Sequence, residues 1–462
     1  MKLFLLTIVI PLFGSLFMLL LSKKLREFFS FIFIFFTFIF SLITLFSVFK
    51  GKEIYLKFGS DGFFNISFLA DGLSSFFALV SSFVSLLIIL YSLGYMKDYE
   101  EKHIFYFWTT FFVGSMMGLV FSSNLLLMYC FWELTGIASY RLIAFYRKKE
   151  DTYSANRAFL ITFFGASLFL VGIVFVYLQF NTLDIKLLKY KNLNNFIAFL
   201  FLFGIFSKSA QLPFETWLPD AGCAPTPVTS LLHAAVLVKI GIYGFMRLFN
   251  NTFLVSDLFL NIVMFLSVIT ILISGSSALR EKDIKRILAY STISQLGYII
   301  FILALFDKFS LINALVYVLA HSLAKAGLFL CAGSVEHSTH TKDIERLGGL
   351  IKSMPIVALT FLMCSFSIIG IAPFLGFWSK LFFIFSLFKR GSFIYGSLAV
   401  IGAFLTLLYL GRFFDKVFLG EEKIKPDKVS GLMLNVSFVF GILSLFFGLC
   451  PNLLFKLLEK IL

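Results

Sequence analysis

Residues 206 to 219 read FSKSAQLPFETWLP, and they continue the apolar run NFIAFLFLFGIF at 195 to 206. The run predicts a membrane-spanning helix, but it contains Lys208 and is interrupted by Pro213. A lysine at the centre of a bilayer costs about 2.5 to 3.5 kcal/mol, and a proline inside a helix costs about 3 kcal/mol more. Pro213 also cannot donate to the carbonyl of Ser209, which leaves that carbonyl free within a turn of Lys208. We interpret the stretch as a broken membrane helix with a functional lysine.

The composition places this stretch in an all-α integral membrane protein. Of 462 residues, 60% are hydrophobic, 14% are charged and 66 are phenylalanine. Apolar stretches able to cross roughly 30 Å of hydrocarbon recur along the whole chain and leave no room for a sizeable soluble domain. We count about fourteen transmembrane helices, near 3–22, 28–49, 68–95, 104–121, 124–145, 156–178, 195–213, 226–247, 255–278, 285–306, 310–333, 354–388, 393–418 and 431–450. The first lacks a cleavage site of small residues, so we expect a retained helix rather than a signal peptide.

A second interruption mirrors the first. In IAPFLGFWSK, at 371 to 380, Pro373 frees the carbonyl of Ile369, and Lys380 follows two turns later. The broken helices are the seventh and twelfth spans. These two spans are five apart in the chain. Because five is an odd number, the units formed by spans 4–8 and 9–13 would enter the membrane from opposite sides, as two inverted five-helix repeats. The alternative is that both prolines only kink helices for packing.

The loops are short, which predicts a single transmembrane domain over 1–462. Within it we expect N-terminal helices at 1–100, a first repeat at 104–247, a second repeat at 255–418, and a last helix with a short amphipathic tail at 431–462. The net charge of +14 comes from short basic loops, a pattern typical of positive-inside topology and not of a nucleic-acid-binding face. This pattern favours an orientation with both termini outside, and we expect the location to be the plasma membrane of a prokaryote.

Several spans contain ionisable residues deep within apolar sequence. Four lysines and one glutamate at about 3 kcal/mol each sum to roughly 15 kcal/mol before pairing, a cost that indicates function. Burial and neighbouring charges switch the protonation of lysine, so we predict a proton path. The proposed path consists of Glu133, Lys208, His233, Lys239, His321, Lys325 and Lys380.

Two partnerships are predicted on this path. Glu133, the only carboxylate in a span centre, is expected to pair with Lys208. His321 and Lys325, four residues apart on one helix face, are expected to pass a proton directly or through water. The alternatives are that Lys239 and Lys325 extend to the membrane surface, and that His233 only hydrogen-bonds a neighbouring helix.

Other residues have less prominent expected roles. Asp71 is expected to cap a helix, Arg141 to extend to the cytoplasmic surface, and Arg412 to pair with Asp415. EHSTH, at 336 to 340, has metal-like spacing, but we expect a solvated loop. The five cysteines are scattered singly, which disfavours an iron-sulfur cluster, a zinc site or disulfides.

The motifs resemble the antiporter-like, proton-conducting membrane subunits shared by respiratory complex I, Mrp-type sodium/proton antiporters and membrane-bound hydrogenases. The matching text, in the family's order, is NLLLMYCFWELTGIASY, KSAQLPFETWLPDAGCAPTPVTSLLHAAVLVKIGIYG, KRILAYSTISQLGY, AHSLAKAGLFLCAGSV and APFLGFWSK. The resemblance covers roughly residues 65 to 420, and KSAQLPF through APTPV is its most specific part.

The resemblance implies fourteen helices, two inverted repeats and a central polar axis. From the positions of these residues in the motifs, the resemblance implies that Glu133 is the glutamate that modulates the first half-channel and that Lys208 is the central lysine of that half-channel. It implies that Lys239 is the connecting group between the halves. His321 and Lys325 would then form the relay, and Lys380 would be the lysine on the exit side. A lysine at position 380 resembles the subunits of the large complex I and Mrp type. Redox chemistry would lie on other subunits, with no cofactor on this chain.

The sequence departs from the family at several positions. Tyr317 stands where relatives of the large type often carry a second histidine. Arg141 replaces an apolar residue, and Gly222 with Cys223 departs from the usual loop. The short tail PNLLFKLLEKIL predicts that a long lateral coupling helix is absent.

The resulting hypothesis is a proton-translocating subunit that works with other membrane subunits, driven by a redox partner or by exchange with sodium. The alternatives are a stand-alone sodium/proton antiporter, a haem- or quinone-dependent membrane oxidoreductase, and a structural scaffold. The sequence leaves open whether the ion is a proton or sodium.

Overall fold

The computed structural model describes residues 3–51, 53–59 and 65–462, and these residues are mostly helical. Ten helices are long and apolar enough to cross a membrane: α2 (Leu25–Phe49), α3 (Gly72–Tyr95), α4 (Lys102–Phe121), α6 (Lys149–Phe180), the helix Thr226–Asn250, α11 (Asp257–Arg280), α12 (Ile284–Ala304), α13 (Lys308–Thr339), α16 (Phe393–Phe418) and α17 (Gly431–Leu449). The helices outside this set are α1 (Leu6–Met18), α5 (Leu125–Ile143), α7 (Asn195–Lys208), α8 (Trp217–Asp220), α14 (Pro355–Ile369), α15 (Leu375–Lys389) and α18 (Pro451–Ile461). Each of the fourteen predicted stretches contains helix, while the number that cross the membrane stays a prediction.

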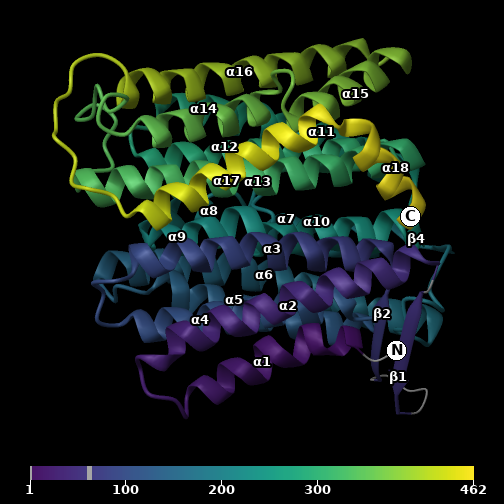
Figure 1. The fold of residues 1–462 in the computed structure, drawn as a ribbon. Coiled ribbons are helices and arrows are strands. Elements are labelled where there is room, and N and C mark those ends of the chain that lie inside the picture. The colour runs from purple at the N-terminus through teal and green to yellow at the C-terminus, as the bar shows by residue number, and fades with distance from the viewer. Residues whose placement is uncertain (1–2, 52, 60–64) are drawn as a thin grey trace.

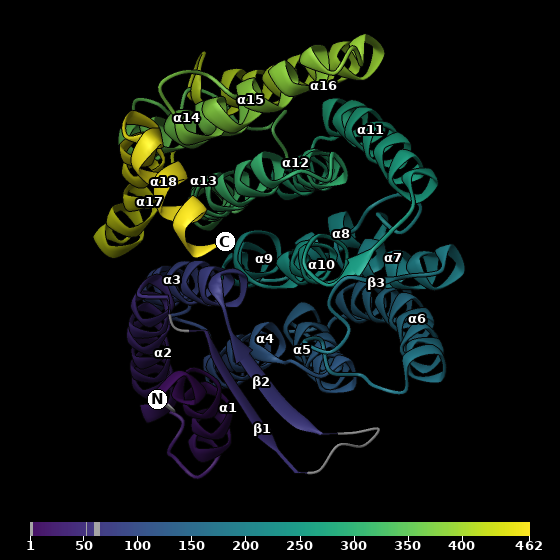
Figure 2. The same cartoon turned by 90° about the vertical axis from the view of Figure 1, so that its right-hand side faces the viewer.

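The helices run side by side, and the described chain ends lie at the same end of the bundle (Figure 1). Seen along the helices, α12 and α13 lie between the α14–α16 group and the helix Thr226–Asn250 (Figure 2). The central helices are almost entirely buried, whereas α2, α6 and α16 expose large apolar side chains such as Phe46, Leu178 and Ile394. An apolar exterior around a polar-containing core is the arrangement that a bilayer requires. The protein is therefore a multi-pass membrane protein.

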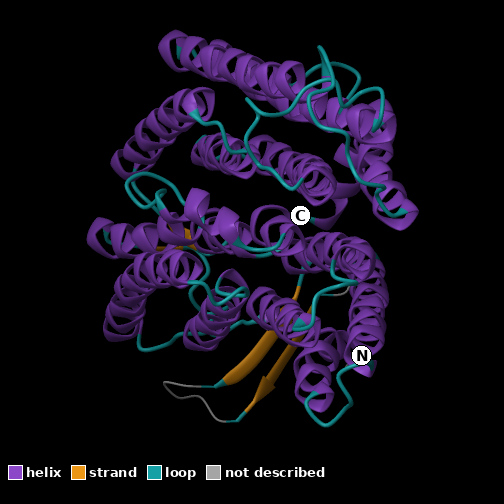
Figure 3. Ribbon diagram, turned by 90° about the vertical axis from the view of Figure 1, so that its left-hand side faces the viewer, coloured by secondary structure: helices purple, strands orange, loops and turns teal. Residues whose placement is uncertain are grey.

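The predicted start of the third span was wrong. Strands β1 (Ile54–Phe58) and β2 (Ile66–Ala70) form an antiparallel hairpin at one edge of the bundle, with Ile54 opposite Ala70 (Figure 3). Helix α3 begins only at Gly72, because Asp71 has extended backbone and accepts a hydrogen bond from the Ser74 N–H. The helix cap on Asp71 is confirmed, and it separates strand from helix.

Both predicted breaks occur. Helix α7 ends at Lys208 and α8 begins at Trp217, while α14 ends at Ile369 and α15 begins at Leu375. Gly370 ends α14 with a φ of 91°, a backbone conformation that glycine adopts without strain. The stretch 354–388, predicted as one broken span, is thus two helices separated by a short connection.

The helix Thr226–Asn250 is irregular where the sequence showed no break. It comprises α9 (Thr226–Ser230), a π-helical turn η3 (Leu231–Ala235), α10 (Leu237–Phe245) and a second π-helical turn η4 (Met246–Asn250). At η3 the Val236 N–H donates to the Leu231 carbonyl at 2.9 Å. Such turns occur often at functional sites.

Two further pairs of residues form very short strands. β3 (Lys191–Asn192) and β4 (Phe253–Leu254) pair in parallel. A 3-10 turn, η1 (Leu3–Leu5), precedes α1, and another, η2 (Ala221–Cys223), follows α8. The prediction of an all-α chain therefore holds for the bundle but misses its small β elements.

Candidate functional site: a buried line of bases

The predicted site residues lie on the inner helices. Glu133 is on α5, Lys208 ends α7, His233 lies in η3, Lys239 is on α10, and α13 and α15 carry the others. Glu133 is half-buried, and the six bases are at most 3% exposed: Lys208, His233, Lys239, His321, Lys325 and Lys380. The alternative in which Lys239 and Lys325 extend to the membrane surface is therefore wrong.

The closest contact between two of these bases joins α10 and α13. Lys239 Nζ lies 2.6 Å from His321 Nδ1. The charged groups acting on His321 are Lys239, Lys325 and His233, all of them bases. At an effective dielectric constant of about 20, two unit charges at this distance repel by about 6 kcal/mol. The pair can therefore hold one proton but not two.

This contact adds Lys239 as a direct partner of His321, while a water-mediated transfer between His321 and Lys325 stays a prediction. His321 is directed to Lys239, and it forms no direct hydrogen bond with Lys325, although the two lie one turn apart on α13. Lys325 instead reaches α12, where Nζ donates to the Ser291 hydroxyl at 2.6 Å and to the Leu288 carbonyl at 3.1 Å. The direct contacts of His321 and Lys325 thus lead to other helices, α10 and α12, rather than along α13.

From Lys325, hydrogen-bonded side chains continue toward α15. Ser291 shares a 2.8 Å hydrogen bond with the Tyr409 hydroxyl. Gln295 donates through Nε2 to Tyr409 at 3.3 Å and to Thr406 at 3.2 Å. Its Oε1 accepts a hydrogen bond from the Tyr317 hydroxyl. Tyr317, which departs from the family, therefore closes a polar chain that begins at Lys325.

Lys380 lies at the other side of this chain. Its Nζ donates to the Ile368 carbonyl at 2.7 Å and to the Ile369 carbonyl at 3.4 Å, both freed from helical pairing by the break between α14 and α15. The ammonium also lies 4.6 Å from the ring centre of Tyr298 and 6.0 Å from that of Tyr317. The prediction that the Ile369 carbonyl is free of the helix and available near Lys380 is confirmed.

The first half of the path is arranged differently. Glu133 and Lys208 interact electrostatically, but no ion pair forms, and Glu133 Oε1 has no hydrogen-bond partner among the described residues. Lys208 Nζ packs against Gly136, 3.1 Å from where a Cβ would lie. The Ser209 carbonyl is outside the helix, as predicted, but it accepts a hydrogen bond from Gln211 at 3.0 Å. Glu133 and Lys208 are therefore electrostatic neighbours, as predicted, without a direct salt bridge.

His233 has no hydrogen-bond partner on either ring nitrogen among the residues that the structure describes. Its ring packs on Phe329, with 4.4 Å between centroids. The interpretation that His233 only hydrogen-bonds a neighbouring helix is therefore wrong. Its two free nitrogens lie in the irregular turn that precedes Lys239.

A buried charge cluster lies at the far end of α13, where we expected a solvated loop. Glu336 belongs to the helix and lies 2.7 Å from Lys285 Nζ and 3.3 Å from Lys342 Nζ. Thr226, the first residue of α9, donates to Glu336 at 3.0 Å. Burial lowers the pKa of Lys342, but the carboxylate of Glu336 outweighs burial, so that pKa lies above its usual value. Glu336 follows Lys325 by eleven residues, or three helical turns, a signal that could have placed both on one face.

Three more ion pairs were missed because their partners lie far apart in sequence. Arg247 makes a bidentate pair with Asp71, at 2.6 and 2.8 Å. Burial raises the pKa of Asp71, but Arg247 and the Ser74 N–H outweigh it and hold that pKa below its usual range. Asp220 on α8 pairs with Arg157 and Arg286, at 2.5 and 2.8 Å, which ties the broken segment to α6 and α12.

Two surface predictions have different outcomes. Arg412 pairs with Glu345 at 3.4 Å and donates to the carbonyl of Glu281, so its predicted pairing with Asp415 was wrong. Arg141 is exposed and lies over the ring of Trp108, 5.8 Å from its centre. Its predicted location at the surface is confirmed.

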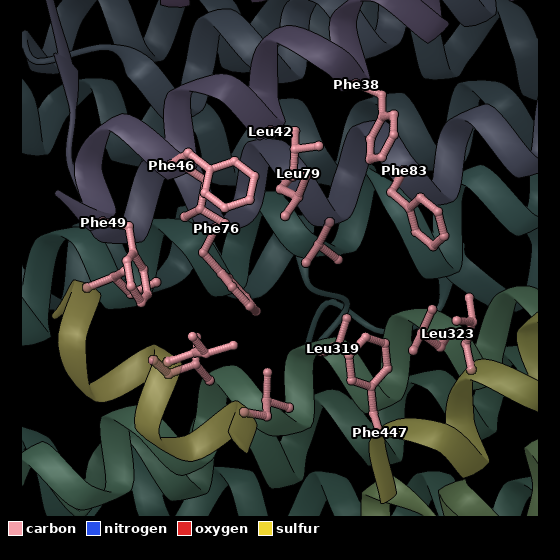
Figure 4. A pocket seen from close by; sticks show the side chains of 17 residues that line it. Phe38, Leu42, Phe46, Phe49, Phe76, Leu79, Phe83, Leu319, Leu323 and Phe447 are labelled. Carbon is pink, nitrogen blue, oxygen red and sulfur yellow. The ribbon is translucent and has the colours of Figure 1, made fainter. Parts of the chain in front are cut away.

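A crevice of ≈ 430 Å³ lies between α2 and α3 on one side and α13, α17 and α18 on the other. Apolar side chains line it, among them Phe38, Phe46, Phe76 and Leu319 (Figure 4). An ion entering it would lose its hydration and find no replacement ligand. The crevice therefore lacks the ionisable side chains that characterise the line of bases.

Comparison with known proteins places this geometry in a family. The sequence model described as "NADH:quinone oxidoreductase/Mrp antiporter, TM" matches residues 122–406, and the one described as "NADH-Ubiquinone oxidoreductase (complex I), chain 5 N-terminus" matches residues 59–106. The A component of a Na(+)/H(+) antiporter from Alkalihalophilus pseudofirmus is 37% identical over 428 residues, which is 84% of this chain and 53% of that protein. The A1 component of a Na(+)/H(+) antiporter from Staphylococcus haemolyticus is 35% identical over 427 residues, with the same coverage. The chain thus spans about half the length of the curated relatives it matches.

Solved structures share the fold. A chain in the Mrp complex from Dietzia sp. aligns with a TM-score of 0.90 at 21% identity, covering 100% of this chain and 96% of that chain. A chain in the membrane-bound sulfane sulfur reductase, an archaeal respiratory membrane complex, aligns with a TM-score of 0.90 at 23% identity, covering 100% and 97%. With a family model matched over more than half of its length, the chain belongs to the family of membrane subunits found in NADH:quinone oxidoreductases and Mrp antiporters.

Proposed function

We propose that this chain is a proton-translocating membrane subunit of a multisubunit complex. The observation that carries the proposal is the 2.6 Å contact between Lys239 and His321, two bases buried in the same core. A proton can cross this contact by a single transfer between nitrogens, and the charge then lies on the other helix. Since a second proton on the pair is excluded by repulsion, a proton arriving from one side favours departure on the other.

The proposed path runs from Glu133 and Lys208, through Lys239 and His321, to Lys325 and Lys380. His233, whose ring nitrogens have no hydrogen-bond partner among the described residues, lies in η3 just before Lys239. Neighbouring charges act on two bases of α13: Lys325 is influenced by Lys380 and Lys239, and His321 by Lys239 and Lys325. Charging one base therefore disfavours the charge on the next, so that occupancy steps along the line.

Between Lys325 and Lys380, we assign positioning roles to Gln295 and Tyr317. An amide does not readily exchange its protons, so Gln295 orients the hydroxyls of Tyr409 and Tyr317 rather than relaying a proton itself. Water between these hydroxyls would complete the route. The break between α14 and α15 contributes the carbonyls that bind Lys380, and both breaks interrupt the apolar environment, at Pro213 and Pro373.

We infer the finer membrane arrangement from the same features. Fourteen spans would form inverted repeats at spans 4–8 and 9–13, with one broken helix in each. Both termini would face outside, in the plasma membrane, because the basic loops gather on the opposite side. The division into N-terminal helices, two repeats and a last helix follows from this arrangement.

The comparisons support partner subunits and an exchange reaction. The relatives are described as Na(+)/H(+) antiporter subunits, and both solved neighbours come from multisubunit membrane complexes. A sodium/proton antiporter subunit is therefore the second candidate function. It is favoured by Glu133 Oε1, which has no hydrogen-bond partner in the described part of the chain and could serve as a ligand for sodium. Under either function we expect no cofactor on this chain, with any redox chemistry on other subunits.

The decisive experiment replaces Lys239 with methionine in the purified complex reconstituted into proteoliposomes. Lys239→Met should abolish coupled proton movement, and His321→Gln should do the same. The double variant should be no worse than either single one, because the two residues act as a unit. Thermal stability should not fall in Lys239→Met, since methionine removes the cost of burying an ammonium and keeps the volume.

Lys352→Met, at an exposed lysine, provides the control and should transport like the wild type. Proton movement at the wild-type level in the Lys239→Met complex would refute the proposed path. Sodium-dependent proton movement would distinguish the antiporter from a subunit driven by a redox partner.

A further inference from the structure

A pocket of ≈ 380 Å³ lies where α1 ends, α4 begins and α5 ends. Its three ionisable lining residues are all bases from separate parts of the chain: Arg26, His103 and Arg141. Among the described residues no carboxylate lines it. The pocket therefore offers positive charge without a built-in counter-charge, which points to an anionic ligand.

The hydrogen bonds of the two arginines leave most of their donors free. Arg26 donates to the carbonyls of Leu21 and Leu19, at 3.4 and 3.3 Å, so its guanidinium is held beside the end of α1 with further N–H groups available. Arg141 forms no ion pair within the described part of the chain, and it rests over the ring of Trp108. Both guanidiniums are thus positioned by contacts that do not neutralise them.

Two carboxylates lie near the pocket without lining it, and neither forms an ion pair with Arg26 or Arg141. Glu27 pairs with Lys102 at 2.8 Å, and Glu101 lies 3.8 Å from His103. Lys23 and Lys24 in the α1–α2 connection add further positive charge. The local balance around the pocket stays positive.

The rest of the pocket is apolar. Leu19, Ile104, Phe107 and Trp108 line it. The pocket lies at helix ends, the depth at which headgroups meet acyl chains, and tryptophan is enriched there. A pocket with guanidiniums on one side and hydrocarbon on the other matches the junction of a phospholipid, where a phosphate joins two acyl chains.

We propose that this pocket binds an anionic phospholipid such as phosphatidylglycerol, with Arg26 and Arg141 on the phosphate and Trp108 against the upper acyl chains. The basic loops at this end agree with the anionic lipids of the cytoplasmic leaflet. The larger apolar crevice of ≈ 430 Å³ contains no group that would select one headgroup over another. The site also assigns a role to Arg141, which lies outside the line of buried bases.

The experiment measures lipid binding to the purified full chain by native mass spectrometry. The probes are short-chain phosphatidylglycerol, short-chain phosphatidylcholine and inorganic phosphate. Phosphatidylglycerol should bind more tightly than phosphatidylcholine, and Arg141→Gln should weaken phosphatidylglycerol alone by about fivefold, the usual contribution of one basic residue at an anionic surface. Arg346→Gln removes the same charge from an exposed loop outside the pocket and should have no effect.

A second measurement does not depend on any change at the arginines. Phosphatidylglycerol with brominated acyl chains should quench a component of the tryptophan fluorescence that is missing in Trp108→Phe. Equal binding of the two lipids, equal losses in Arg141→Gln and Arg346→Gln, or no quenching at Trp108 would each overturn the proposal. Displacement of the lipid by millimolar phosphate would show that the pocket takes a free anion instead, and would also overturn it.

Discussion

Replacing Tyr317 with phenylalanine removes one hydroxyl at the point where the chain of hydrogen bonds from Lys325 meets Lys380. The ring remains, so its packing on Tyr298 and its contact with the Lys380 ammonium are kept. What is lost is the hydrogen bond that Tyr317 donates to Gln295 Oε1. The substitution therefore tests the hydroxyl alone.

The magnitude follows from the burial of Gln295. Its Oε1 has no other partner within the described residues, and an unsatisfied buried acceptor costs about 1 to 3 kcal/mol. Gln295 would also orient less firmly toward Tyr409 and Thr406, at 3.3 and 3.2 Å. If this cost falls on the step between Lys325 and Lys380, proton movement slows by about 5-fold to 150-fold.

The assay is proton movement in proteoliposomes that contain the complex, with the melting temperature measured on the same preparations. Tyr298→Phe is the matched control, because Tyr298 also faces Lys380 and donates its hydroxyl to a carbonyl, that of Ala399, outside the chain from Lys325. Tyr298→Phe should keep transport within about twofold at a similar loss of one hydrogen bond. Equal transport in Tyr317→Phe and the wild type, or equal losses in the two variants, would refute the assigned role of Tyr317.

Two further predictions concern stability. Asp71→Asn should lower the free energy of unfolding by about 3 kcal/mol, because Arg247, 3% exposed, loses its counter-charge; the melting temperature reports this loss. Since the pKa of Asp71 is lowered in the folded state, the pair stabilises the wild type above the ordinary aspartate value of about 3.9, and that stabilisation is lost as pH falls through the folded-state pKa. Gly376→Ala should lower the free energy of unfolding by about 1 to 3 kcal/mol, because a Cβ there would lie 1.9 Å from the Ser367 carbonyl oxygen.

Each stability prediction has its own control. Acidification below pH of about 4 should lower the melting temperature of the wild type more than that of Asp71→Asn, and parallel curves would contradict the pairing argument. Gly411 has no atom within 4 Å of an added Cβ, so Gly411→Ala should be neutral or stabilise α16 by up to about 1 kcal/mol. A Gly376→Ala variant as stable as Gly411→Ala would show that the connection between α14 and α15 tolerates a side chain.

Much of the architecture could be predicted because it depends on properties that are local in sequence. Apolar runs of sufficient length form helices in a bilayer, since every backbone group must be satisfied within its own segment. Pro213 and Pro373 interrupt helices through the missing N–H, and Asp71 caps α3 through its own side chain. The predicted bases lie within these apolar runs, and a charged group is costly in lipid, so their burial inside the bundle could be expected.

Other local features escaped prediction because their sequences are ambiguous. The segment ISFLA at 66 to 70 is as apolar as the helix that follows, and only its pairing with β1 makes it a strand. The π-helical turn around His233 contains no proline or glycine that would have predicted it. The position of this turn, just before Lys239, depends on how the helix packs against its neighbours.

The sequence by itself determined that this protein crosses a membrane many times, where two helices break, and that ionisable residues such as Lys208 and Lys380 lie within apolar runs. Only the tertiary structure decided their partners: His321 meets Lys239, 82 residues away, rather than Lys325, and Arg247 meets Asp71 across 176 residues. The physical reason is that burial sums over a short stretch of chain, whereas a hydrogen bond requires two groups to approach within about 3 Å. That approach is set by how helices distant in sequence pack against one another.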